Sequence, residues 1–171
     1  MSFDHRRIGL RALVFLALAA VLLPSHALEA PRYKVVLTVT GKIGTTNGPG
    51  TAAFDMAMIE RLPQQTFTTR TPWSNEPVKF TGPLLRDLLA AVKATGSNIR
   101  AVALNDYKIS IPVDDANRFG VIVAHRMNDM PIPVRTKGPL FIVYPFDARQ
   151  ELQSNKYYER SIWQLKAIDL E

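Results

Sequence analysis

Runs rich in β-branched and aromatic residues recur along the chain after its first 27 residues, and they predict a fold dominated by strands. The first such run, Tyr33–Thr40, reads Tyr-Lys-Val-Val-Leu-Thr-Val-Thr and is typical of a strand. A loop is expected over Gly41–Gly50, which holds four of the nine glycines. Further strands are predicted at Thr66–Thr71, Ile99–Leu104, Lys108–Val113, Val121–Arg126, Pro139–Tyr144 and Ser161–Asp169, with turns at Asn105-Asp106 and Asn128-Asp129.

Helical spacing of apolar residues is confined to a few segments. One helix is predicted over Ala52–Leu62, ended by Pro63. A second is predicted to begin at Gly82-Pro83, because proline suits the first helical position, and to stop near Gly96. Its buried face would consist of Leu84, Leu85, Leu88, Leu89 and Val92. A short helix is expected at Arg149–Lys156, and few helices among many strands indicate an α+β fold with mixed sheets.

The first 27 residues have the three-part layout of a secretory signal peptide. Arg6, Arg7 and Arg11 form a basic region, Ala12–Leu23 is apolar, and small residues precede a cleavage position after Ala27. A retained membrane anchor is the alternative, but the apolar run would cover about 18 Å as a helix, short of a hydrocarbon core of roughly 30 Å. We therefore expect residues 1–27 to be removed on export to the periplasm, leaving residues 28–171 as a single domain.

Two export routes fit the basic region. The arginine pair partly resembles a twin-arginine signal, although the phenylalanine expected two positions after the pair is absent. Basic residues at this place are common in ordinary secretory signals, so the general secretory route is favoured.

Composition excludes several classes of site. The chain contains no cysteine, which rules out disulfides, thiolate zinc sites and iron–sulfur ligation. The formal net charge of +6 falls to about +4 when the signal peptide leaves, because three arginines and one aspartate leave with it. No dense basic helix is present, so no nucleic-acid partner is expected.

Candidate chemistry is sparse when judged by spacing alone. His125 is the single histidine after the signal peptide and is either a general base or, more commonly for a lone histidine, a hydrogen-bonded structural residue. Asp114-Asp115 fits a metal site less well than a helix cap. Tyr157-Tyr158 and Trp163 suit a core or an interface.

Basic residues gather around the two strands predicted after His125. They form either an anion pocket or a set of solubilising charges at strand ends. These residues are Arg126, Arg135, Lys137 and Arg149.

Five segments together resemble the sulfite oxidase-like family of molybdopterin-binding oxidoreductases, in matching order and spacing. The resemblance covers about Phe67 to Ile168, most of the chain after the signal peptide. Its pieces are Trp73-Ser74 with Phe80-x-Gly82, the Tyr-x-x-Ser-Ile-Pro stretch from Tyr107, Ile122–Pro133, Arg135–Pro145, and Ser161–Leu165.

The resemblance implies a molybdenum–pterin cofactor and two-electron oxidoreductase chemistry. It places Tyr107 beside the metal, where a phenol can donate a proton or hydrogen bond. It places Thr69, Trp73, Arg126, Arg135 and Lys137 around the cofactor or an oxyanion.

Three departures from the family pattern weigh against that chemistry. Thr69 stands where the family carries its metal-binding thiolate, and a threonine hydroxyl is no soft ligand. Phe141 stands in place of an arginine, and Phe146 in place of a glycine. Two functions remain open: a divergent molybdopterin-dependent oxidoreductase, or a cofactor-free binding or sensory module that takes a small anion or a pterin. Either would act with a separate redox or membrane signalling partner.

Overall fold

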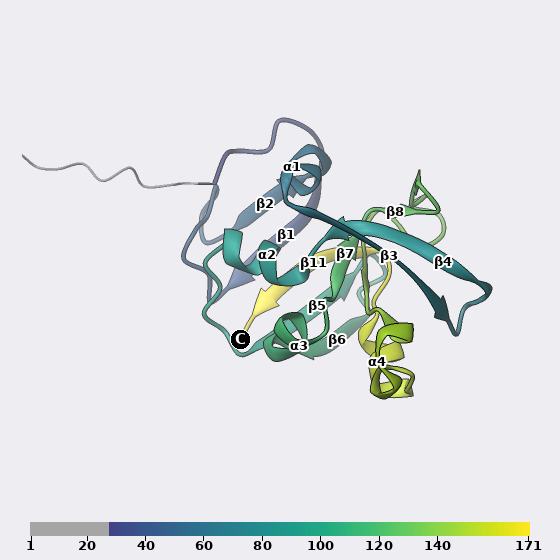
Figure 1. Cartoon of the computed structure of the whole chain (residues 1–171). Helices are drawn as coiled ribbons and strands as arrows, with labels where there is room; N and C mark the ends of the chain where they lie inside the picture. The colour runs from purple at the N-terminus through teal and green to yellow at the C-terminus, as the bar shows by residue number, and fades with distance from the viewer. Residues whose placement is uncertain (1–27) are drawn as a thin grey trace, which may run out of the picture.

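A computed structural model describes residues 28–171, and its largest element is a five-stranded sheet (Figure 1). The predicted signal peptide lies outside the described residues. The strand order is β2-β1-β11-β5-β6. β1 pairs with β11 in parallel, whereas the other neighbours are antiparallel. The last strand, β11, lies between β1 and β5. The strands are β1 (Val35–Gly41), β2 (Ala52–Asp55), β5 (Asn98–Ala103), β6 (Lys108–Pro112) and β11 (Leu165–Leu170).

Two smaller sheets stand beside the large one. A four-stranded sheet has the order β3-β4-β8-β9, and a two-stranded sheet pairs β10 with β7. The long β3–β4 hairpin projects from the body of the protein (Figure 1). Trp73 lies at its tip, between the paired residues Thr71 and Ser74. The strands are β3 (Gln64–Thr71), β4 (Ser74–Pro83), β7 (Ile122–Ala124), β8 (Arg126–Met127), β9 (Met130–Pro131) and β10 (Phe141–Val143).

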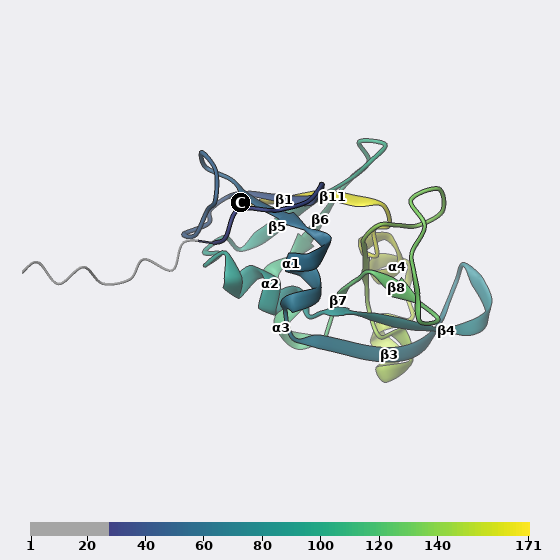
Figure 2. The same ribbon diagram turned by 90° about the horizontal axis from the view of Figure 1, so that it is seen from above.

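Helices fill the space between the large sheet and the hairpin. Figure 2 shows α1, α2 and α3 on the face of the five-stranded sheet that is turned toward β3 and β4. The helices are α1 (Met56–Arg61), α2 (Leu85–Ala91), α3 (Val113–Arg118) and α4 (Asn155–Arg160), with 3-10 turns at Phe146–Ala148 and Gln150–Leu152. Within residues 28–171, no helix is long and apolar enough to cross a membrane.

One continuous core joins these layers, and the predicted leucine face of α2 lies in it. All five predicted residues of that face, Leu84, Leu85, Leu88, Leu89 and Val92, are buried. The α+β fold with mixed sheets is thus confirmed. The asparagine and aspartate turns are confirmed as well, since Asp106, Asn128 and Asp129 take positive φ angles.

The predicted helix boundaries were wrong in two places. Ala52–Asp55 forms strand β2 rather than the start of a helix, and the Asp55 carboxylate caps α1 by accepting a hydrogen bond from the Met58 amide at 2.9 Å. Pro83 is the last residue of β4 and not the first of a helix, because it pairs opposite Gln64 and α2 begins at Leu85.

Other elements were missed or displaced. β4 has mostly polar, exposed residues in its first half, so its pattern does not signal a strand. α3 follows directly on β6 and begins at Val113, the last residue of the predicted strand Lys108–Val113. His125 interrupts the predicted strand Val121–Arg126, and the helix expected at Arg149–Lys156 is a 3-10 turn followed by α4.

Candidate ligand-binding pocket

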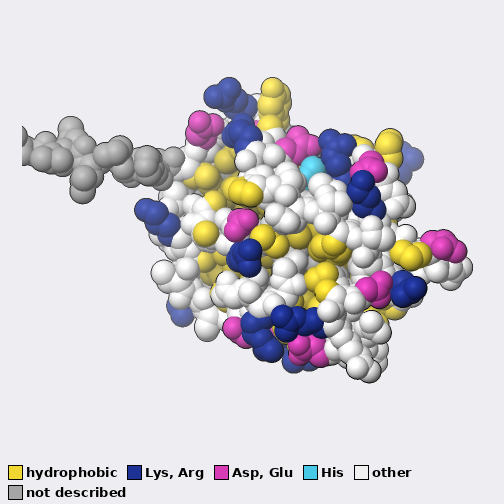
Figure 3. Space-filling view, viewed as in Figure 1, with side chains coloured by type: hydrophobic (Ala, Val, Ile, Leu, Met, Phe, Trp, Pro, Cys, Tyr) yellow, Lys and Arg dark blue, Asp and Glu magenta, His cyan; other side chains and the backbone are white. Residues whose placement is uncertain are grey.

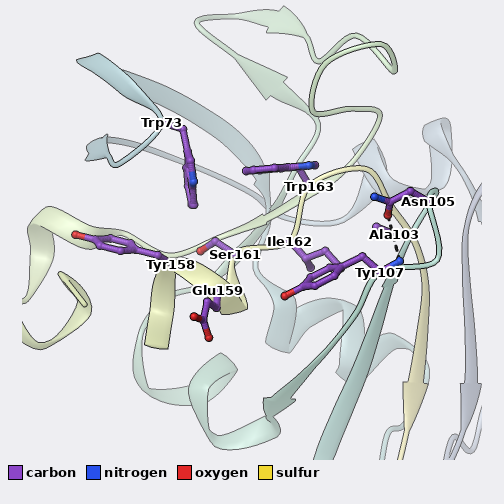
Figure 4. Close-up of a pocket in the computed structure, with 9 residues that line it drawn as sticks. All are labelled: Trp73, Ala103, Asn105, Tyr107, Tyr158, Glu159, Ser161, Ile162 and Trp163. Atoms are coloured by element: carbon purple, nitrogen blue, oxygen red, sulfur yellow. Dashed lines mark hydrogen bonds between the residues drawn. The ribbon is translucent and has the colours of Figure 1, made fainter. Parts of the chain in front are cut away.

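An open pocket lies where the tip of the β3–β4 hairpin, the β5–β6 turn and the end of α4 meet (Figure 4). Its volume is about 360 Å³, toward the lower end of the roughly 300–1,000 Å³ typical of small-molecule sites. The residues that line it are Trp73, Ala103, Asn105, Tyr107, Tyr158, Glu159, Ser161, Ile162 and Trp163.

The β5–β6 turn presents Tyr107 to the pocket. Within the turn, Asn105 Oδ1 accepts a hydrogen bond from the Tyr107 amide at 3.1 Å, and Asp106 adopts a φ of 66°. Lys166 Nζ holds Asp106 Oδ1 at 2.6 Å, which ties the turn to β11. The Tyr107 residue remains 49% exposed. Its phenol points toward the side of the pocket that carries Ser161 and Glu159 (Figure 4).

Helix α4 supplies Tyr158 and Glu159, and a buried ionic network anchors it. Arg160 Nη1 lies 2.6 Å from Asp115 Oδ2, and the Tyr144 hydroxyl donates to the same oxygen at 2.7 Å. Burial, together with this hydrogen bond, raises the pKa of the Tyr144 hydroxyl well above its usual range, so it stays a donor. The network fixes the last turn of α4 and therefore the two side chains just before it.

Trp73 is the centre of an aromatic cluster that forms the inner wall. Its ring meets the Trp163 ring at 87°, with centroids 5.5 Å apart, and the Tyr158 ring at 73° and 6.2 Å. Behind it, Phe141 and Phe146 lie 5.9 and 6.1 Å away. Two tryptophan faces at right angles thus bound the pocket, and phenylalanines fill the space behind them.

The charge of the lining is negative. Glu159 is its one ionised side chain, and neither the Glu159 carboxylate nor the Tyr107 hydroxyl forms a hydrogen bond or ion pair with another residue in the range 28–171. The Ser161 hydroxyl is already used, since it donates to the Tyr157 carbonyl at 3.0 Å. Elsewhere, positive and negative side chains are interspersed, as on the face shown in Figure 3.

Thr69 does not reach this pocket. It is 1% exposed, and its hydroxyl accepts a hydrogen bond from the Asp147 amide at 2.9 Å. In return, Asp147 Oδ2 accepts from the Arg70 amide at 2.8 Å. The threonine therefore joins β3 to the 3-10 turn after β10, and its oxygen is already committed to the protein.

The structure does not bring the predicted cations together. Arg126 contacts Glu60 at 3.5 Å and the Asp129 carbonyl at 3.2 Å. Arg149 contacts Glu151 at 3.5 Å and stacks over Phe119.

The other two cations also lie outside the set that lines the pocket. Arg135 lies exposed in the loop before β10. Lys137 comes nearest, with Nζ 5.4 Å from the centre of the Trp163 ring. The four residues therefore do not form a single anion pocket.

His125 is a structural residue. It is 5% exposed, its Nε2 lies 2.9 Å from Gln64 Oε1, and its Nδ1 lies 3.7 Å from Glu60. Burial lowers its pKa and so favours the neutral ring.

The adjacent aspartates behave as helix-start residues. Asp114 and Asp115 occupy the first turn of α3, and among the described residues no group of three potential ligands is placed to hold a metal.

Comparison with known proteins identifies the fold family. The family model for the oxidoreductase molybdopterin binding domain matches residues 37–148, well over half of the chain. The chain belongs to this family. A search of curated proteins finds no match. The match to the molybdopterin-binding domain includes Trp73 and Tyr107 but ends before α4, so Tyr158, Glu159 and Trp163 lie beyond it.

The residues present do not fit the cofactor for which the molybdopterin-binding family is named. A phosphorylated pterin is anionic and needs donors or cations, whereas this lining is aromatic with one carboxylate. No cysteine exists to ligate the metal, and Thr69 is closed off by its own hydrogen bond. Phe141 and Phe146, at positions where the resemblance implies arginine and glycine, are 0% and 1% exposed.

Sequence reasoning missed much of the lining. None of the lining residues Ala103, Asn105, Glu159, Ser161 and Ile162 was named as a candidate site residue, although Asn105 was assigned to a turn and Ser161–Leu165 to the family resemblance. The aromatic residues that flank them, Tyr158 and Trp163, were interpreted as core or interface. The available signal was an acidic residue within a stretch dense in aromatic side chains.

Proposed function

We propose that this protein is a cofactor-free ligand-binding module built on the molybdopterin-binding fold. The observation that carries the proposal is the state of Thr69: the residue at the metal-ligand position is buried, and its hydroxyl serves as an acceptor for the Asp147 amide. A thiolate is the protein ligand that the resemblance implies for the metal, and a threonine hydroxyl that is already hydrogen-bonded does not replace it.

The pocket beside Trp73 supports a binding role. It has a rigid aromatic wall, an anchored helix on one side and a tight turn on the other. Among its polar groups without a partner in residues 28–171 are the Tyr107 hydroxyl and the Glu159 carboxylate, which are the kind of group that orients a ligand.

A divergent oxidoreductase is the second candidate, and one observation favours it. The family match spans Tyr107, and the phenol of this residue lines the pocket. In that case the metal would be held by its pterin alone, and Tyr107 would donate a proton or hydrogen bond to the substrate. This candidate predicts that Tyr107→Phe slows turnover, whereas a binding module would retain its fold and show no turnover to lose.

The deciding experiment is the molybdenum and pterin content of the protein purified from its native periplasm. Elemental analysis measures the metal, and fluorescence after oxidation measures the pterin. A thiolate-bearing family member, purified in parallel, controls for cofactor supply. We expect neither component in a folded, monodisperse sample. About one molybdenum and one pterin per chain would overturn the proposal and establish the oxidoreductase.

Export belongs to the same proposal. The tripartite layout of residues 1–27 supports cleavage after Ala27 and a periplasmic location. A module without its own redox centre or anchor in residues 28–171 would pass its signal to a separate membrane protein. Intact mass of the periplasmic protein checks the cleavage, since a chain that starts at Leu28 is expected. A full-length chain in the membrane fraction would contradict it.

A further inference from the structure

We infer that the pocket beside Trp73 takes a small organic cation of the quaternary ammonium class, which rests on the proposed ligand-binding function and names its ligand. The walls, the charge and the size of the pocket each favour this class of ligand.

The walls present electron-rich faces. Trp73 and Trp163 meet at 87°, and Tyr158 adds a third ring at 73° to Trp73. An aromatic face attracts a cation through its quadrupole, most strongly for tryptophan, and rings at steep angles let one cation touch several faces. Lys137, which lies outside the lining, has its ammonium 5.4 Å from the centre of the Trp163 ring, within the range of a cation–π contact.

The lining adds a full negative charge and offers no positive one. Glu159 lines the pocket without an ion-pair partner among residues 28–171, and no lysine or arginine lines it. An anion would meet the carboxylate and the negative ring faces together, so charge disfavours it. The Ser161 hydroxyl is engaged with the Tyr157 carbonyl and offers a neutral polar ligand no donor. A neutral ligand also gains no charge–charge attraction from Glu159.

Size and polarity favour a compact, poorly hydrated cation over a primary amine. A primary ammonium needs acceptors for its three N–H donors and is strongly hydrated, so it gives up much of its hydration in a site walled by aromatic rings. A quaternary ammonium needs none, and it loses little hydration when it enters an aromatic site. About 360 Å³ accommodates such a group with a short substituent.

The test exploits the fact that the chain has two tryptophans and that both line this pocket. Intrinsic fluorescence therefore reports on the site, and isothermal titration gives the affinity. The probes are choline and its neutral isostere 3,3-dimethylbutan-1-ol. We expect choline to bind at least about tenfold more tightly, in keeping with cation–π attraction in a partly desolvated site. Equal affinities, or no saturable change with choline, would overturn the inference.

Variants locate the effect. Glu159→Gln should weaken choline binding about fivefold and leave the alcohol unchanged, because it removes charge and keeps shape. Glu151→Gln is the matched control, an exposed glutamate on a 3-10 turn outside the pocket. Trp163→Leu should weaken choline binding about tenfold while the thermal unfolding midpoint identifies any loss of fold. An unchanged choline affinity in both pocket variants would place the binding elsewhere and refute the inference.

The two levels of the proposal fail in different ways. If the alcohol or benzoate gives a saturable fluorescence change that Trp163→Leu abolishes, and choline does not, the binding module stands and the cation inference falls. If molybdenum and pterin are retained at about one per chain, the binding module itself falls, whatever choline does.

Discussion

Two regions of the molecule carry chemically capable side chains, and they differ in how far the protein satisfies them. Around His125, every polar group has an internal partner: the ring contacts Gln64 and Glu60, and Arg126 contacts Glu60 as well. Around Trp73, the Glu159 carboxylate and the Tyr107 hydroxyl face a hollow with no partner from residues 28–171.

Residue type therefore does not by itself indicate a site. Histidine and arginine are the usual candidates for catalysis and anion binding, yet here they close a network between α1, β3 and β8. The region around Trp73 contains fewer of the residue types that usually act in catalysis, but it retains polar atoms without hydrogen-bond partners in residues 28–171 beside the pocket. Binding capacity lies where the protein leaves groups unpaired and reachable.

The largest expected effect concerns the wall behind the pocket. Phe141 is 0% exposed and packs against Trp73, Phe80 and Trp163. Phe141→Ala should lower the free energy of unfolding by about 4 kcal/mol, through lost transfer energy and a cavity. Urea denaturation measures it. Tyr107→Ala, in an exposed turn, is the control and should change stability by less than about 1 kcal/mol. Equal losses would mean that the pocket rim is as structural as its wall.

The anchor of α4 ranks next. Asp115→Ala would leave the Arg160 guanidinium and the Tyr144 hydroxyl without their shared acceptor, in side chains that are mostly buried. Loss of one partner of such a pair costs about 3 kcal/mol. Asp114→Ala tests the neighbouring carboxylate, which is exposed and pairs with Arg118 at 3.5 Å, and should cost less than about 0.5 kcal/mol. Chemical denaturation measures the free energy of unfolding of both variants. Similar losses in the two would show that Asp115 does not anchor α4.

Some elements of the fold can be predicted from the apolar pattern of the sequence, and others cannot. The leucine spacing of α2 reflects burial on one face, which periodicity detects directly. The split between β2 and α1 depends on Asp55 turning its carboxylate back to the Met58 amide, a local geometry that the apolar pattern of Ala52–Leu62 does not encode. Likewise, β4 is a strand because it pairs with β3 and β8, and not because of its own alternation.

The site was harder to predict than the fold for a similar reason. Trp73 and Tyr107 follow from the family resemblance, and both line the pocket. Glu159 and Trp163 reach it only because Arg160 docks α4 on α3, a contact between residues 45 positions apart. The cations Arg126 and Arg149 are close in sequence but contact different elements. Contacts between residues far apart in the sequence, such as Arg160 and Asp115, decide which side chains line the pocket, and the composition of the chain does not predict them.

A smaller effect is expected at the buried threonine. Thr69→Val keeps the shape but removes the acceptor of the Asp147 amide, which should cost about 1–2 kcal/mol. Thr68→Val, on the exposed side of the same strand, should be near neutral. Unfolding in urea compares the two. If Thr69→Val left the free energy of unfolding unchanged, the Thr69 hydroxyl would not contribute to stability, and it could be available to a ligand.

The smallest effect is a pH dependence, which between pH 7.5 and 5 belongs to the network around His125. Burial lowers the pKa of His125 in the folded protein, so the unfolded chain, with a histidine pKa of about 6.5, binds the proton more readily. Stability contributed by the neutral ring is therefore present above about pH 6.5 and is lost as the pH falls below it. The lowered carboxyl pKa values of Asp106 and Asp169 act in the same direction, but only at more acidic pH, near and below their ordinary value of 3.8. The free energy of unfolding, measured in urea, should thus fall between pH 7.5 and 5 in the wild type, with a slope that corresponds to the uptake of less than one proton. The same free energy should change less with pH in His125→Gln. Identical slopes in both proteins would show that His125 is free to protonate where it stands, and the contrast between a closed polar network and an open aromatic pocket would lose its clearest solution signature.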